Sequence, residues 1–249
     1  MKAVIILCLC AVLALANGVP ANTRIVGGWE ALPRQLPYIV SLRIESENFH
    51  FCGATIISKR TLLTAAHCRY VREPLMVAVV GTTTIDDKFA TRVHVEEFII
   101  HPDYNPYEFT NDIAVVILAE DIEFNEKVQP IKVSTSPVPD NEKVTSAGWG
   151  YTTYNGEISN DLHWMSQTVV NAEECAEASP GETITGKICA LDTDGNGQSV
   201  CFGDTGGPLV DSNDELVGVV TMNVHCNPNK PDFFTNIYLA KSWIEANTR

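Results

Sequence analysis

Three separate segments of this 249-residue chain carry side chains that could together perform hydrolytic chemistry. His67 lies in Thr-Ala-Ala-His-Cys, Asp112 lies in Asn-Asp-Ile-Ala, and Thr205 lies in Gly-Asp-Thr-Gly-Gly-Pro-Leu. Attack by an alcohol on a carbonyl carbon needs a base for the hydroxyl proton, a carboxylate that orients the base, and donors for the oxyanion. We therefore predict one site built from His67, Asp112 and Thr205.

Each of these motifs has a less specific interpretation when it is taken alone. A single histidine is usually a structural or surface residue, and Asp112 before the apolar segment 113–118 could simply cap a strand. The glycines around Thr205 allow a tight, exposed turn whatever its purpose. The occurrence of all three motifs in the order histidine, aspartate, hydroxyl favours the catalytic interpretation.

The segment Cys201–Leu209 resembles the Gly-Asp-Ser-Gly-Gly-Pro-Leu nucleophile loop of the chymotrypsin and trypsin family, with Thr205 where the family has serine. The resemblance implies that His67 acts as general base and then as general acid, and that Asp112 orients it. It also implies that the backbone N–H groups of Gly203 and Thr205 form the oxyanion hole.

The threonine leaves two functions open. Its extra methyl group occupies a second staggered position on the Cβ atom that carries the hydroxyl. An off-rotamer side chain costs roughly 0.5–1.5 kcal/mol, and displacing the attacking oxygen by about 1 Å lowers the rate ~10²-fold. We expect a strongly impaired or absent peptidase that acts mainly by binding. The alternative is an active endopeptidase that uses Thr205, because the rest of the hydrolytic equipment is retained.

The resemblance also locates a specificity pocket, with Ser199 at its floor and Thr221, Met222 and Asn223 as the strand that binds the polypeptide. The family usually has Ser-Trp-Gly at that strand, and Asp232 falls where a pocket-wall glycine is usual. Asp232 could place a carboxylate in the pocket that accepts Lys or Arg. Alternatively, Asn223 and Asp232 together fill the pocket, and we favour this narrowed pocket.

The N-terminus has the pattern of a secretory signal peptide over residues 1–16, with a lysine, an apolar run and Ala-Leu-Ala. Residues 17–24 then form a short polar propeptide that ends at Arg24. The resemblance implies an activation site at this point, where cleavage frees the amino group of Ile25 to pair with the carboxylate of Asp204. A buried ammonium needs such a partner, so we expect a zymogen that is secreted to the extracellular space.

Six of the eight cysteines follow the predicted signal peptide, and they are Cys52, Cys68, Cys175, Cys189, Cys201 and Cys226. An even number in an exported protein favours three disulfides over free thiols or a metal site. Six cysteines allow fifteen pairings. The resemblance implies Cys52 with Cys68, Cys175 with Cys189, and Cys201 with Cys226.

From residue 37 onward, short apolar segments alternate with turn residues, which is typical of an all-β sandwich or barrel. The predicted strands cover 38–44, 51–58, 76–80, 93–100, 113–118, 144–149, 209–211 and 216–222. A helix is predicted over Ile237–Asn247, with Leu239, Trp243 and Ile244 on one face. For the peptidase-like domain, residues 25–249, the resemblance implies two six-stranded antiparallel β-barrels with the active site in the cleft between them. We place the boundary between the barrels near 133–139, where Ser-Thr-Ser-Pro-Val-Pro indicates a linker.

The charge and the histidine spacing of the chain limit the classes of partner and ligand that we expect. The chain carries 31 acidic and 17 basic residues, a formal net charge of −14, which argues against nucleic acid or an anionic membrane as partner. The five histidines besides His67 lack metal-ligand spacing and are interpreted as surface or core residues: His50, His94, His101, His163 and His225. We expect a monomer without metal or cofactor whose partners are a polypeptide substrate or protein ligand, including protease inhibitors.

Overall fold

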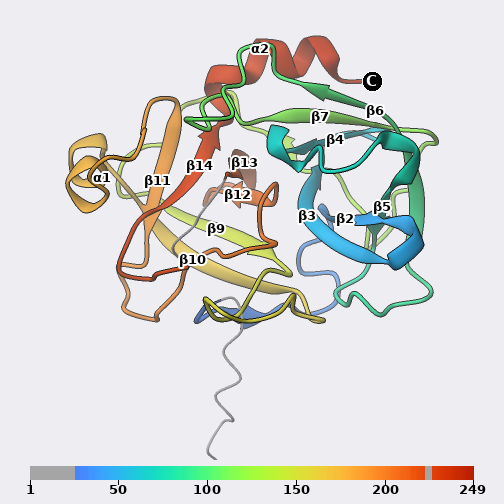
Figure 1. Cartoon of the computed structure of the whole chain (residues 1–249), viewed down its shortest axis with the longest axis horizontal. Helices are drawn as coiled ribbons and strands as arrows, with labels where there is room; N and C mark the ends of the chain where they lie inside the picture. The colour runs from blue at the N-terminus through green and yellow to red at the C-terminus, as the bar shows by residue number, and fades with distance from the viewer. Residues whose placement is uncertain (1–25, 222–225) are drawn as a thin grey trace, which may run out of the picture.

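The computed structural model describes residues 26–221 and 226–249. The predicted signal peptide and propeptide lie outside this part of the chain. Figure 1 shows two groups of strands side by side, the first coloured blue to green and the second yellow to red.

Six strands of the first group close into an antiparallel barrel in the order β2-β3-β4-β7-β6-β5. They are β2 (Ile39–Ile44), β3 (Phe49–Ile56), β4 (Thr61–Thr64), β5 (Met76–Val80), β6 (Thr91–Ile100) and β7 (Ala114–Leu118). Every residue of β5 and β7 is buried, because these apolar segments have protein on both faces. The barrel therefore holds Asp112 rigidly, two residues before β7.

The second barrel is a ring in which β9 pairs with both β10 and β12, and β11, β14 and β13 complete the circuit. Its strands are β9 (Lys143–Gly148), β10 (His163–Val170), β11 (Lys187–Leu191), β12 (Pro208–Val210), β13 (Glu215–Val220) and β14 (Asp232–Asn236). Two short strands extend this sheet, β1 (Trp29–Glu30) beside β10 and β8 (Lys132–Val133) parallel to β13. The two six-stranded barrels confirm the predicted fold class.

The helices are short and lie outside the barrels. The two α-helices are α1 (Ala172–Ala178) and α2 (Ile237–Asn247), and the 3₁₀ helices are η1 (Glu45–Glu47), η2 (Ala66–Cys68) and η3 (Glu73–Leu75). Helix α2 has the predicted bounds, and the side chain of Asn236 caps its first turn. Its predicted apolar face is partly wrong, because Leu239 is 64% exposed while Ile237, Ala240 and Ile244 are buried.

The terminal helix joins the two barrels. It follows β14 of the second barrel and lies beside β6 and β7 of the first (Figure 1). The Arg249 carbonyl accepts hydrogen bonds from Ser58 Oγ at 2.7 Å and from Thr61 Oγ1 at 2.9 Å. The buried residues of α2 belong to the same apolar cluster as the first-barrel core. The helix thus fixes the relative position of the barrels, and with it the site between them.

A strand is present at each of the eight predicted segments, and within the described residues the ends differ by at most two residues; residue 222, the predicted end of the last segment, lies outside them. Those that the sequence did not indicate include β4, β10, β11 and β14. In β10, Gln167 and Thr168 are buried, so its sequence does not alternate apolar with polar residues. In β4, Thr61 and Thr64 are buried as well as the two leucines between them. The buried polar residues of these strands form hydrogen bonds inside the protein. The alternation of apolar and polar residues that usually identifies a strand in a sequence is therefore missing.

Three disulfides join Cys52 to Cys68, Cys175 to Cys189, and Cys201 to Cys226. This is the pairing that the family resemblance implied. In residues 26–221 and 226–249, no helix is long and apolar enough to cross a membrane.

Candidate active site

His67 is held by the first barrel. It is the middle residue of η2, which directly follows strand β4. The next residue, Cys68, forms the disulfide with Cys52 of β3, and Thr64 Oγ1 donates to the Gly53 carbonyl at 2.7 Å. The backbone on both sides of His67 is therefore tied to β3, which limits where the imidazole can lie.

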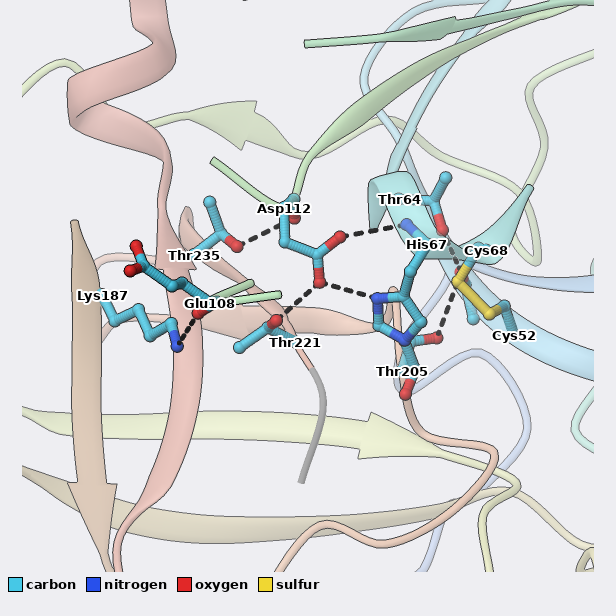
Figure 2. A network of polar contacts seen from close by, with 11 residues as sticks. Cys52, Thr64, His67, Cys68, Glu108, Asp112, Lys187, Thr205, Thr221 and Thr235 are labelled. Atoms are coloured by element: carbon cyan, nitrogen blue, oxygen red, sulfur yellow. Dashed lines mark hydrogen bonds and ion pairs between the residues drawn. A yellow bond between two sulfur atoms is a disulfide. The ribbon is translucent and has the colours of Figure 1, made fainter. Parts of the chain in front are cut away.

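Asp112 is fully buried beside this imidazole. Its Oδ2 accepts from His67 Nδ1 at 2.7 Å, and its Oδ1 accepts from the backbone N–H of His67 at 3.0 Å. Thr221 Oγ1 donates to Oδ2 at 2.5 Å, and Thr235 Oγ1 donates to the Asp112 carbonyl at 2.8 Å. Figure 2 shows that donors from both barrels converge on this one residue. The carboxylate is fully occupied, so its position is fixed.

The loop that carries Thr205 has a backbone that requires glycine. Gly203 has φ +98°, and a Cβ atom there would lie 2.5 Å from Ile158 Cδ1. Gly206 has φ +82°, and a Cβ atom there would lie 2.2 Å from Thr64 Oγ1. Both residues adopt a conformation that side chains disfavour, in places without room for one. The glycines thus bring the loop close to β4, where η2 places His67.

Hydrogen bonds hold Thr205 between two strands. Its carbonyl accepts from the Gly53 N–H at 2.7 Å, and the following Gly206 N–H donates to the Val220 carbonyl at 2.8 Å. In the described part of the chain, the backbone N–H groups of Gly203 and Thr205 donate no hydrogen bond. Two unused donors next to a hydroxyl are the arrangement that an oxyanion hole needs.

The Thr205 hydroxyl does not engage the imidazole. Thr205 lies next to the His67 ring in Figure 2. Within the described residues, however, neither Thr205 Oγ1 nor His67 Nε2 takes part in a hydrogen bond. The ring is thus oriented from its Nδ1 side alone. Catalytic hydrogen bonds are often loose before substrate binds, so this geometry by itself leaves proton transfer from Thr205 open.

A cavity of about 550 Å³ begins at His67 and Thr205. Its walls carry five aromatic side chains, and these are Phe49, Phe51, Tyr70, Tyr151 and Phe202. We call this the aromatic cavity. Tyr70 is 71% exposed and Phe202 is 42% exposed, so apolar surface lies open to solvent beside the site. Exposed apolar surface of this kind marks a binding surface more often than a random feature.

Ser199 and Asp232, the predicted pocket residues, lie in contact and are fully buried. Asp232 Oδ1 accepts from Ser199 Oγ at 2.9 Å, while Oδ2 accepts from Val200 N and Gln167 Nε2, each at 2.8 Å. Burial raises the pKa of Asp232 to about 7, and the nearby Asp204 carboxylate acts in the same direction. The carboxylate is thus fastened to the floor of the predicted pocket by three protein donors.

Asp204 precedes Thr205 directly, is fully buried and does not line the aromatic cavity. Its carboxylate accepts from the backbone N–H groups of Gly150 and Cys201, each at 2.8 Å. Burial raises its pKa to about 7, while these two hydrogen bonds lower it. Within residues 26–221 and 226–249, no cation pairs with Asp204. A buried carboxylate without a cation fits the expected pairing with the Ile25 amino group.

Four predicted site residues lie outside the described residues. They are Arg24 and Ile25 at the predicted activation site, and Met222 and Asn223 of the predicted substrate strand. Thr221, the first residue of that strand, is described, and its hydroxyl binds Asp112.

Sequence reasoning missed the residues that support the triad from the second barrel. Lys187 Nζ donates to the Glu108 carbonyl at 3.0 Å and so holds the segment before Asp112 (Figure 2). The adjacent Phe109 meets the His67 ring edge-on, with the ring centres 5.4 Å apart. Lys187 follows Glu108 by 79 residues, so no local pattern could have indicated the contact. Phe202, in contrast, precedes Gly203 directly, and an aromatic residue at this place in the predicted nucleophile loop was a usable sequence signal.

Comparisons with known proteins agree with this geometry. The family model described as trypsin matches residues 25–244. Chymotrypsin-2 of Vespa crabro is 36% identical over 224 residues, which are 90% of this chain and 99% of that protein. Serine protease 1 of Rattus norvegicus is 30% identical over 249 residues, 98% of each chain. Trypsin II-P29 of Gallus gallus is 31% identical over 243 residues, 97% of this chain and 95% of the relative. Each match extends over both barrels.

Proposed function

The chain belongs to the trypsin family of serine peptidases, and on that premise we propose that it binds polypeptides at the His67–Thr205 site and hydrolyses them only slowly. The observation that carries this proposal is the nucleophile position. Thr205 presents a hydroxyl beside a fully oriented histidine, yet the two side chains share no hydrogen bond in the described structure.

Polypeptide binding is supported by the surface next to the triad. The aromatic cavity adjoins Thr205 and is large enough for one or more side chains of an extended chain. Its open aromatic rings offer apolar contact, and the unused N–H groups of Gly203 and Thr205 can receive a peptide carbonyl. None of these features requires that the bound peptide be cut.

The chemistry of cleavage follows from the oriented imidazole. The Asp112 carboxylate accepts a hydrogen bond from the Nδ1–H of His67, so in the neutral ring Nε2 is the bare nitrogen and can take the Thr205 proton. The oxygen would then attack the carbonyl carbon, and the oxyanion would receive the two N–H donors. His67 would return the proton to the leaving amine.

Slow turnover follows from the methyl group of Thr205. Placing Oγ1 against Nε2 requires the methyl to occupy one of the two remaining staggered positions. Thr205 has the Cys52–Cys68 disulfide on one side and its own oxyanion donors on the other. A displacement of the attacking oxygen by about 1 Å would lower the rate ~10²-fold, and contact with the tetrahedral intermediate would add to this loss.

A second candidate function is an active endopeptidase with Thr205 as nucleophile. It is favoured by the short hydrogen bond between His67 and Asp112, since peptide binding alone does not need an oriented base. Threonine serves as a nucleophile on other scaffolds.

One set of variants separates these functions. The form that begins at Ile25 is prepared as native, Thr205→Ser and Thr205→Ala proteins, and turnover is measured on a broad fluorogenic peptide library. We expect kcat of the native protein to lie at least ~10²-fold below Thr205→Ser, while peptide binding is similar in all three. Native turnover equal to that of Thr205→Ser establishes the active endopeptidase. If none of the three proteins binds peptides, the binding function is contradicted.

The same proposal includes where the protein acts, how it is activated and what it binds. Secretion is supported by the predicted signal peptide and by three disulfides, which persist in oxidising compartments. Activation at Arg24 is supported by the buried Asp204 carboxylate. The partners are then extracellular polypeptides, either substrates, protein ligands or protease inhibitors. N-terminal sequencing of the protein secreted by an expressing cell line, before and after treatment with a protease that cuts after arginine, tests both points. A start at Asn17 identifies the secreted zymogen, and a start other than Ile25 after the treatment contradicts the activation site.

A further inference from the structure

Arg43 is a fully buried arginine on strand β2. Its Nη1 donates to the Ile85 carbonyl at 2.7 Å and to Asn48 Oδ1 at 3.0 Å, and its Nε donates to Ser41 Oγ at 2.8 Å. In the described residues, no carboxylate pairs with the guanidinium, and Nη2 has no hydrogen-bond partner. A buried, incompletely satisfied cation is costly, so its retention calls for an explanation beyond packing.

Arg43 is the first member of a buried chain of hydrogen bonds. Ser41, two residues earlier on the same face of β2, binds His50 Nδ1 with its hydroxyl at 2.8 Å. The other ring nitrogen of His50, Nε2, lies 2.9 Å from the Gly203 carbonyl. The chain thus leads from Arg43 to the loop of Thr205.

The direction of each hydrogen bond in this chain is determined. Burial is the main cause that lowers the pKa of His50, to about 4, so the ring is neutral at physiological pH. The Gly203 carbonyl can only accept, so Nε2 carries the single ring proton and Nδ1 is bare. The bare Nδ1 then requires the Ser41 O–H as donor. The hydroxyl points that way because Arg43 Nε, which can only donate, faces the oxygen from the other side.

We propose that Arg43 is a positioning residue for the oxyanion hole, which acts through Ser41 and His50 on the Gly203 carbonyl. With Arg43 in place, the Ser41 hydroxyl has one acceptor, His50 is held in its Nε2–H tautomer, and Gly203 is anchored. Without Arg43, the hydroxyl can rotate and His50 can adopt the other tautomer. A bare Nε2 would then face the carbonyl oxygen, and this repulsion would release the loop. The functional part of this inference rests on the proposed role of Gly203.

The first test measures the tautomer, which needs no enzymatic activity. Long-range ¹H–¹⁵N spectra of the histidine rings are recorded for the native full chain and for Arg43→Met, an unbranched side chain that replaces the aliphatic part of the arginine and carries no donors. Arg92→Met is the matched control, because the exposed Arg92 donates to the same Asn48 Oδ1 at 2.6 Å without touching Ser41. Ser41→Ala removes the middle of the chain and serves if Arg43→Met does not fold.

The native protein and Arg92→Met are expected to show His50 as the pure Nε2–H tautomer. Arg43→Met and Ser41→Ala are expected to show a mixture of tautomers and faster amide exchange at residues 203–205. Unchanged His50 signals and unchanged amide exchange in both of these variants overturn the proposal.

The second test measures catalysis in the Thr205→Ser background. Adding Arg43→Met is expected to lower kcat about tenfold with little change in KM, less than the ~10²-fold loss typical of removing a whole oxyanion-hole donor. Adding Arg92→Met is expected to leave both constants unchanged. A normal kcat beside a mixed His50 tautomer overturns the role in the oxyanion hole. An inactive Thr205→Ser protein contradicts the proposed function instead, and the tautomer measurement still decides whether Arg43 positions the loop.

Discussion

The Asp112 carboxylate accepts two hydrogen bonds from the same residue, His67, one from the ring Nδ1 at 2.7 Å and one from the backbone N–H at 3.0 Å. One buried group therefore fixes the tautomer and the orientation of the imidazole together with the position of the backbone that carries it. Thr221, from the second barrel, adds a third donor to this carboxylate. The triad geometry thus depends on both barrels.

Replacing Asp112 is expected to abolish most catalysis. In the Thr205→Ser background, Asp112→Asn presents an amide where Nδ1 needs an acceptor, which favours the wrong tautomer, and kcat should fall ~10⁴-fold, as in the family's triad. Thr221→Val removes only one donor to the carboxylate and should cost about 10- to 10²-fold, since one hydrogen bond to a charged group contributes about 1.5–3 kcal/mol. Steady-state kinetics of the two variants checks this, and equal losses would contradict the leading role of Asp112.

The ionisation of Asp204 is expected to destabilise the uncleaved chain. Burial raises the pKa of this group to about 7 in the folded state, above the ~3.9 of an unfolded aspartate. Between these values the native state binds more protons, so the free energy of unfolding falls as the pH rises from about 4 to 7. Asp204→Asn should lack this contribution. Denaturant unfolding of both proteins across that range measures it as a difference. The opposite contribution of His50 cancels in this difference, as does the part of the Asp232 contribution that does not depend on the Asp204 charge.

The form that begins at Ile25 provides the comparison for this prediction. Its terminal ammonium is expected to pair with the Asp204 carboxylate and so to lower the pKa of that group. The loss of stability between pH 4 and 7 that depends on Asp204 should therefore be smaller in this form than in the uncleaved chain. The same pH dependence in both forms would contradict the predicted pairing.

Asp232 is expected to restrict the pocket through its volume rather than to attract a cation. Its carboxylate is fastened by Ser199, Val200 and Gln167. In the Thr205→Ser background, Asp232→Gly should raise kcat/KM about 10-fold or more for peptides with Phe before the cleaved bond, the scale of a small change in pocket volume. Asp232→Asn, which keeps the volume, should not. A preference for Lys or Arg that Asp232→Asn abolishes would show that the carboxylate binds cations.

The aromatic cavity explains why the triad was easier to predict than its surroundings. Each triad residue lies in a short motif that can be recognised in the sequence, and the glycines around Thr205 indicate a tight turn. The aromatic residues of the cavity come from β3, the segment after η2, the loop after β9 and the Thr205 loop. Only the closure of two barrels against each other brings these segments together, and no local pattern records it.

Sequence by itself determined the family, five of the six strands of the first barrel, three of the six strands of the second barrel and the bounds of α2, and it predicted the triad positions, because glycine turns, apolar periodicity and short motifs are local properties of the chain. Tertiary structure alone decided that Arg43 is buried in line with His50 and Gly203, and that Asp232 is fastened beside Ser199. An arginine in a strand is ordinarily exposed, and its burial depends on partners such as Ile85, 42 residues away. The sequence also predicted Thr205 as the nucleophile. Whether its hydroxyl forms a hydrogen bond with His67 depends on the side-chain geometry, which is set by the packed neighbours of both residues.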